Sequence, residues 1–339
     1  MSPTKVFLIQ LLNIAGLGPV FGPILGALYG PIALLWVVIG CVFAGAVHDY
    51  FSGMLSVRYN GKSVPDIVGY NLGDLIKKLM RVFAVVLLIL VGVVFVAGPA
   101  GLLSQLTGMH SMLFVAIIFA YYFLATILPV DKIIGRVYPF FAVLLVFMAV
   151  GLLGALAFKG YTFYSNIEWT MHSPSGLPAW PLVFITIACG ACSGFHATQS
   201  PLMARCINNE KHGRKIFYGA MIAEGVIGLI WVTLGMSFYS DTAALAAALG
   251  PKGNAALVVN NISVELLGVF GGALAVLGVV VLPVTSGDTA FRSARLVLAD
   301  WFHVEQKSIK GRLMLCIPVL GVGAILGVGN ALGKIDYTC

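Results

Sequence analysis

The segment Asn13-Ile-Ala-Gly-Leu-Gly-Pro-Val-Phe-Gly-Pro-Ile-Leu-Gly26 is apolar enough for a lipid bilayer, yet it contains four glycines and two prolines. Proline removes a backbone donor and clashes with the preceding turn, and glycine costs about 1 kcal/mol relative to alanine inside a helix. The segment therefore predicts an interrupted helix. Unwound backbone at membrane depth is tolerated only where it is buried in protein or lines a wet cavity.

The composition of the whole chain places this segment in a membrane protein. Of its 339 residues 60% are hydrophobic and only 10% are charged, which leaves too few charges for the surface of a soluble protein of this size. Several apolar runs approach the ~20 residues that a helix needs to span a bilayer. We predict an all-α polytopic membrane protein with nine spans. These cover residues 6–28, 32–57, 82–104, 110–128, 136–158, 181–204, 216–239, 264–286 and 312–332.

The net charge of +7 is unevenly distributed along this predicted topology. All but three of the 20 Lys and Arg residues fall on the same side as the N-terminus, and the exceptions are Lys159, Lys252 and Lys334. An excess of basic residues marks the cytoplasmic side of a membrane protein, so we predict a cytoplasmic N-terminus. The basic loops then contact anionic lipid headgroups, and nucleic acid is not an expected partner.

A second span is interrupted in the same way as the first. It contains Ile187-Ala-Cys-Gly-Ala-Cys-Ser-Gly-Phe-His-Ala-Thr-Gln-Ser-Pro201. Spans 1–5 (residues 1–158) then form one repeat, and spans 6–9 (residues 181–339) form a second, inverted repeat that lacks its last helix. A matched pair of interrupted spans in two inverted halves indicates the binding site of a secondary transporter. The alternative is that the glycines serve close packing between helices.

Five stretches of the chain, in order, resemble the carbon starvation protein A (CstA) family. They are Asn13–Pro23, Phe43-Ala-Gly-Ala-Val-His-Asp49, Phe184–His196, Tyr218-Gly-Ala-Met-Ile-Ala-Glu224 and Ser286–Arg295. The resemblance implies a LeuT-like fold and a multi-pass transporter of the cell inner membrane. It also implies import of pyruvate by proton symport, of a related small carboxylate, or of short peptides during carbon starvation. The family pattern extends beyond both ends of the chain, so we expect a truncated member.

We predict that the substrate binds between the two interruptions, where free N–H groups suit an anion and free carbonyls suit a cation. His196 is a candidate for binding or proton coupling, and the alternative is that it has only a structural role. In particular, we expect the backbone at Gly18 and Gly194 to approach the ligand. The predicted binding residues are Gly16, Gly18, Pro19, Ser193, Gly194, Phe195, His196 and Thr198.

Ionisable side chains inside spans are costly and so are candidates for ion coupling. His48 and Asp49 suit a proton relay, although Asp49 could instead pair with Arg58 and hold structure. Glu224 has no cation near it in the sequence. A buried carboxyl without a partner can carry a proton at neutral pH, so Glu224 is a candidate for proton coupling. The alternative is that it forms a hydrogen bond between helices. These residues favour H⁺ over Na⁺ as the coupling ion.

The last candidates lie where the eighth span is predicted to end, and they rest on the resemblance. LeuT-like proteins hold sodium between spans 1 and 8, which makes Thr285, Ser286, Asp288 and Thr289 candidates for a cation site. The alternative is a helix end with an Asp–Arg pair on the cytoplasmic face, formed with Arg292 or Arg295.

The motifs of common enzyme classes are missing: the chain contains no Gly-x-Ser-x-Gly elbow, no His-Glu-x-x-His and no phosphate-binding loop. We therefore expect no enzyme, no cofactor and no metal. A channel-like or starvation-sensing membrane protein is the alternative to a transporter, and an oxidoreductase that uses Cys189 and Cys192 is a weaker one. The sequence leaves the oligomeric state open.

Overall fold

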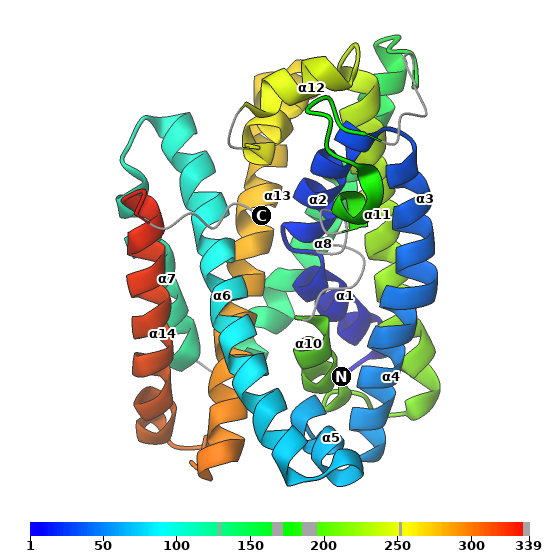
Figure 1. The fold of residues 1–339 in the computed structure, drawn as a ribbon. Coiled ribbons are helices and arrows are strands. Elements are labelled where there is room, and N and C mark those ends of the chain that lie inside the picture. The colour runs from blue at the N-terminus through cyan, green and yellow to red at the C-terminus, as the bar shows by residue number, and fades with distance from the viewer. Residues whose placement is uncertain (128–129, 165–171, 185–194, 251–252, 335–339) are drawn as a thin grey trace.

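The computed structural model describes residues 1–339 apart from 128–129, 165–171, 185–194, 251–252 and 335–339. For 126–127, 130–139 and residue 275 it describes the backbone but not the side chains. Long helices run side by side through the molecule, and shorter ones lie across its two ends (Figure 1). The described residues are almost entirely helical, as the composition predicts.

The first predicted span is broken, which confirms the interruption. Helix α1 (Pro3–Ile14) ends before Ala15, and α2 (Gly18–Gly26) begins three residues later and continues as the 3-10 turn η1 (Ala27–Tyr29). The two parts meet at an angle of 47°. Pro19 lies in the first turn of α2, where a missing N–H removes no helical hydrogen bond.

The second span joins α3 (Ile32–Ile39) to α4 (Ala46–Arg58) through a π-helical turn, η2 (Gly40–Gly45). A second π-helical turn, η4 (Arg214–Tyr218), leads into α11 (Gly219–Phe238). The remaining described elements are α5 (Val64–Leu72), α6 (Asp74–Thr107), α7 (Ser111–Ile127), α8 (Val130–Phe158), α10 (His196–Ala204), η3 (Glu210–His212), α12 (Thr242–Leu249), α13 (Ala255–Phe302) and α14 (Ile309–Ala331).

The predicted eighth span, 264–286, is wrong at both ends. Helix α13 begins at Ala255, kinks at Gly268, where φ is 69°, and continues to Phe302. The apolar run stops at Asp288, but the helix does not, because the charged side chains that follow are buried against neighbouring helices. Arg292 donates there to Asp288 and to Ala125 O. The expected helix end on the cytoplasmic face is therefore wrong, and the Asp288–Arg292 pair lies inside the helix.

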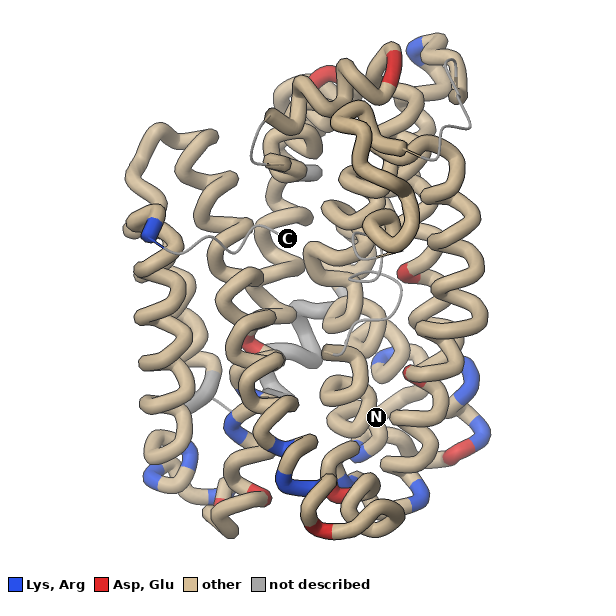
Figure 2. The backbone as a smooth tube through the Cα atoms, viewed as in Figure 1, with Lys and Arg blue, Asp and Glu red and all other residues tan. Residues whose placement is uncertain are grey.

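Six helices among the described residues are long and apolar enough to cross a bilayer, and the bent α1–α2 pair makes a seventh. Helix α7 is apolar but shorter, and most of the predicted span 181–204 lies outside the described residues. Lys and Arg gather at the end of the bundle that carries α5, as a positive-inside orientation requires (Figure 2). The division into repeats 1–158 and 181–339 stays a prediction.

Two large apolar cores and a smaller cluster around Phe217 hold the bundle together. One includes Ile24 of α2, Leu145 of α8 and Trp231 of α11. The other includes Leu88 of α6 and Phe291 of α13, with residues of α7 and α14. Helices α1 and α2 belong to the first core, while Gly16, between them, faces Phe95 of α6 and Ser286 of α13. The break in the first span therefore lies between the two cores.

At the basic end, α5 is held by a buried carboxylate. Asp66 accepts hydrogen bonds from Ser63 at 2.9 Å and Arg81 at 2.8 Å, and its carboxylate lies 3.0 Å from Lys77 Nζ. Burial opposes ionisation of this group, but the hydrogen bonds from Lys77, Ser63 and Arg81 outweigh it and hold the pKa of Asp66 below its ordinary value. Helix α6 therefore extends through Lys77 and Arg81, well before the predicted start of its span at residue 82.

We expect Asp66→Asn to weaken the attachment of α5 by about 2 kcal/mol, because it leaves two cations without their anion. Amide hydrogen exchange of α5 measures this opening. The folded-state pKa lies below the unfolded value of about 3.9, so the contribution is complete at neutral pH. It declines as the pH falls below about 4 and is lost below the folded-state pKa. Asp74→Asn, at an exposed carboxylate in α6, is the control; equal exchange in both variants would contradict the prediction.

Candidate functional site

The break in the first span exposes backbone acceptors that the helix no longer uses. The N–H of Gly16 bonds to Ile14 O instead of Leu12 O, so the hydrogen-bond pattern of α1 ends there. The Ser286 hydroxyl of α13 takes over: its oxygen lies 3.1 Å from Asn13 O and 3.4 Å from Leu12 O. Buried carbonyls require such partners. Helix α13 is thus bonded directly to the end of α1.

Side chains add a second contact between the same two helices. The Thr289 hydroxyl lies 3.1 Å from Asn13 Oδ1 and 3.2 Å from Thr285 O, and so can donate to either. Ser286, Thr289 and Asn13 are all buried. Several uncharged oxygens lie close together here, from Leu12, Asn13, Ser286 and Thr289. Hard cations bind to oxygen ligands of this kind. In the structure the hydroxyl protons occupy these acceptors instead.

The other oxygen-rich residues of α13 do not reach the break. Thr285 donates to Leu282 O within its own helix. Asp288 lies 2.7 Å from Arg292 Nη2, and the same nitrogen donates to Ala125 O of α7 at 3.3 Å. Asp288 therefore faces α7 and is occupied by its ion pair. Of the predicted cation ligands on α13, the structure brings Ser286 and Thr289 to α1.

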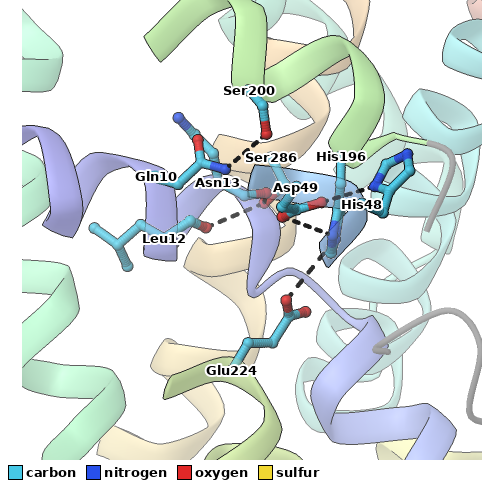
Figure 3. Close-up of polar contacts among 9 residues, drawn as sticks. All are labelled: Gln10, Leu12, Asn13, His48, Asp49, His196, Ser200, Glu224 and Ser286. Atoms are coloured by element: carbon cyan, nitrogen blue, oxygen red, sulfur yellow. Dashed lines mark hydrogen bonds and ion pairs between the residues drawn. The ribbon is translucent and has the colours of Figure 1, made fainter. Parts of the chain in front are cut away.

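Four ionisable side chains from three helices meet beside the break (Figure 3). Asp49 of α4 lies between two histidines, with Oδ1 2.9 Å from His48 Nδ1 and Oδ2 3.3 Å from His196 Nδ1. On the far side of the His196 ring, Nε2 lies 3.8 Å from Glu224 Oε2 of α11. We call these four residues the His–carboxylate chain. At 3.8 Å this contact is too long for a hydrogen bond, but it is short enough for an ion pair.

Burial makes the charge of this chain consequential. Asp49 and Glu224 are fully buried, His196 is 1% exposed, and the His48 side chain is 33% exposed. With both carboxylates ionised and His196 protonated, the three buried residues carry one net negative charge. A buried charge without a partner is expensive, so one further proton on this group relieves a real cost. The arrangement can therefore take up and release a proton.

The His–carboxylate chain touches the break itself. The imidazole of His196 lies against the backbone of Ile14, the last residue of α1. Gln10, one turn earlier, donates to Ser200 of α10 at 3.2 Å. The ring of Phe195 meets that of Phe95 edge to face, with centroids 6.0 Å apart. A change in the charge of His196 is thus felt directly at the end of α1.

The predicted binding residues fall into three groups. Gly16 lies in the break, and Gly18 and Pro19 are the first residues of α2, so the break is centred slightly before the predicted Gly18. Phe195 and His196 lie beside the break, whereas the Thr198 hydroxyl bonds to Phe195 O. Ser193 and Gly194, together with Cys189 and Cys192, lie outside the described residues.

Two predicted pairings differ from the observed ones. Asp49 pairs with His48 and His196, and not with Arg58. Glu224, which has no cation near it in sequence, finds one in His196, 28 positions away. Gln10 and Asn13 were missed altogether. Amide side chains in the first apolar span were the available signal, since polar groups inside a span require a partner.

The fold defines the class of protein. The structure matches that of MhsT, crystallised in complex with L-phenylalanine, with a TM-score of 0.59 over 99% of this chain and 82% of that one. At 16% sequence identity the match supports a conclusion about the fold alone. The protein is thus a helical membrane protein with the LeuT-like fold.

Sequence comparison gives the family. The family model described as "Carbon starvation protein CstA" matches residues 1–100 and 99–268, and the chain belongs to this family. An uncharacterized membrane protein of Haemophilus influenzae is 50% identical over 302 residues, covering 74% of this chain and 81% of that protein.

Several relatives carry functional names, and two of them illustrate the range. The peptide transporter CstA of Bacillus subtilis is 29% identical, covering 64% of this chain and 47% of that protein. The pyruvate/proton symporter BtsT of Escherichia coli is 26% identical, covering 64% of this chain and 39% of that protein. The match therefore spans less than half the length of either transporter.

We expect Gly16→Ala to destabilise the protein by about 1–3 kcal/mol, the usual range for overpacking. An added Cβ would lie 2.9 Å from Phe95 Cζ and 3.2 Å from Ser286 Oγ, so α6 or α13 has to move away from the break. Gly101→Ala, in α6 with no atom within 4 Å of the added carbon, is the control and should stabilise slightly. Thermal unfolding in detergent compares the two. The same gain in both variants would show that the break is loosely packed.

Proposed function

We propose that this protein is a secondary active transporter that couples uptake of a small organic solute to protons. The observation that carries the proposal is the position of His196 between Asp49 and Glu224, against the end of α1. A coupled transporter needs an ion-binding group whose state changes the conformation at the substrate site. Here the proton-binding residues belong to α4, α10 and α11, which meet at the broken helix.

The coupling ion in this proposal is H⁺. The His–carboxylate chain contains buried groups that gain or lose a proton, and histidine titrates near neutral pH in its unperturbed state. A sodium ion is the competing candidate, favoured by the uncharged oxygens of Asn13, Ser286 and Thr289. These oxygens already form hydrogen bonds with one another, which supports a structural link between α1 and α13. No cofactor enters the proposal.

The proposed substrate carries a carboxylate. Pyruvate and peptides, which appear in the names of two relatives, share this group. The N-terminus of α2 supplies the positive end of a helix dipole at the break, as Leu17 is its N-cap and Gly18 its first residue. Binding an anion here needs no additional buried cation. Gly16, Gly18 and Pro19 are therefore the proposed contacts on the first span. From the sixth span we propose Phe195, together with Ser193 and Gly194, which lie outside the described residues.

The proposed exit for the proton leads to the basic end of the bundle. Thr198, two residues after His196, lines a cavity of about 20 Å³ together with Ser293, Arg205 and Asp300. A space of this size admits a water molecule, and the polar lining suits one. We propose that this end faces the cytoplasm of the cell inner membrane. Labelling of an introduced cysteine near Lys211 in intact and opened cells tests the orientation.

The decisive experiment measures accumulation of labelled pyruvate and a labelled dipeptide by the full-length protein in proteoliposomes. A pH gradient alone should drive uptake of at least one of them, whereas a sodium gradient alone should not. Sodium-driven uptake would transfer the coupling role to Ser286 and Thr289. Single-channel currents in a planar bilayer would instead favour a channel.

We expect Glu224→Gln to abolish accumulation driven by a pH gradient while leaving solute counterflow within about threefold of the unmodified protein. The amide preserves shape but removes one of the two carboxylates that hold a proton on His196, so exchange continues without coupling. Glu210→Gln, at an exposed carboxylate in η3, is the matched control and should change neither assay. Full gradient-driven accumulation by the Glu224 variant would remove this residue from the coupling path.

A further inference from the structure

A wide apolar groove lies outside the proposed transport site, between α1, α8 and α11. Its volume is about 640 Å³, within the range of about 300–1,000 Å³ that is common for ligand sites. All of its lining side chains are apolar; they include Phe7 and Leu8 of α1, Val150 and Gly151 of α8, and Ala223 of α11. We call this space the α1–α8–α11 groove.

The groove is open on the side of the bundle that faces lipid. Of the α8 residues that line it, Val143 is 67% exposed and Val150 is 59% exposed. No water is present in the hydrocarbon layer to fill such a space, and voids are unfavourable in packed interiors. An aliphatic occupant from the bilayer is therefore the simplest one that matches the lining.

Unpaired cations flank one end of the groove. Lys5 lies one helical turn before Leu8 on the same face of α1. Arg214 and Lys215 are exposed in η4, directly before α11, where Phe7 packs close to Gly219. Within the part of the chain that the structure describes, none of these three cations takes part in an ion pair. These cations are therefore available to an anion at this end of the groove.

We propose that the α1–α8–α11 groove holds an acyl chain of an anionic phospholipid, whose phosphate lies beside Lys5, Arg214 and Lys215. The apolar lining accounts for the chain and the three cations account for the headgroup. A second copy of the protein fits less well. Copies inserted in the same orientation would bring identical cations together across the interface.

This lipid would have a mechanical role that goes beyond the proposed transport function. Helix α1 is a short segment joined to α2 by the break at Ala15–Leu17. A lipid in the groove would contact α1, α8 and α11 at once and hold α1 against the bundle. If the lipid binds this conformation more tightly than one in which α1 has moved away from the bundle, it shifts the equilibrium toward the conformation described here.

Two glycines of α8 provide a matched test. Gly151 lines the groove and Gly154 does not, and an added Cβ at either position meets no atom within 4 Å. Gly151→Leu places an aliphatic side chain into the groove, whereas Gly154→Leu adds the same side chain outside it. Val150→Trp is a second way to fill the groove, at a position that is already exposed. A triple variant, Lys5→Gln with Arg214→Gln and Lys215→Gln, removes the cations alone.

Native mass spectrometry of the purified full-length protein measures retention of phosphatidylglycerol and phosphatidylcholine with matching acyl chains. We expect the unmodified protein and Gly154→Leu to retain phosphatidylglycerol about tenfold better than phosphatidylcholine. The triple variant should lose this preference. Gly151→Leu and Val150→Trp should retain little of either lipid. Inorganic phosphate added in excess should not displace the lipid, because the acyl chain supplies part of the binding.

Three results would overturn the proposal. The first is undiminished retention of phosphatidylglycerol in both groove-filling variants. The second is equal retention of the two lipids by the unmodified protein. The third is a lipid-free dimer that Gly151→Leu dissociates and Gly154→Leu does not, which would assign the groove to a second copy. Each result is independent of transport, so failure here leaves the proton-coupling experiment unaffected.

Discussion

Two carbonyl groups at the end of α1 determine how the centre of this molecule is built. Once the helix stops at Ile14, the oxygens of Leu12 and Asn13 need new donors, and the Ser286 hydroxyl of α13 supplies one. That bond ties α13 to the first span. The sequence of the first span favours the break. The neighbouring helices stabilise it by supplying donors for the freed carbonyls. Gly16 permits the close approach because α6 and α13 leave no room for a side chain there.

Electrostatics completes the same centre from the other side. Asp49 and Glu224 would each be costly alone in this environment, and His196 reduces the cost for both. His196 is the first residue of α10 and reaches the end of α1 from that helix, as Ser286 reaches it from α13. The backbone of Ile14 and the imidazole of His196 are in contact, and the two parts of the site respond to each other.

The sequence predicted the parts of this structure that depend on local chemistry. Glycine and proline within an apolar run were enough to locate the break. Ionisable residues within spans were enough to select Asp49, His196 and Glu224 as candidates, and their role in ion coupling stays a prediction. Which of these residues meet depends on how helices pack, and neither the pairing of Glu224 with His196 nor the isolation of Asp288 follows from spacing. Hydropathy likewise ended the eighth span near Thr285, because it records how polar a side chain is and not whether a partner buries it. Helices α5 and α12 were missed because both are too short to give a span-length apolar signal.

The two π-helical turns have a consequence for the alignment of the carboxylates. One, Gly40–Gly45, immediately precedes the helix that carries Asp49, and the other, Arg214–Tyr218, precedes the helix that carries Glu224. A π-helical turn contains one residue more than an α-helical turn, and one residue corresponds to about 100° of rotation about the helix axis. If both helices ran straight, each carboxylate would be turned by about this angle, away from the shared imidazole. The angular register of two separate helices, set by one additional residue in each, is what allows a single histidine to lie between them.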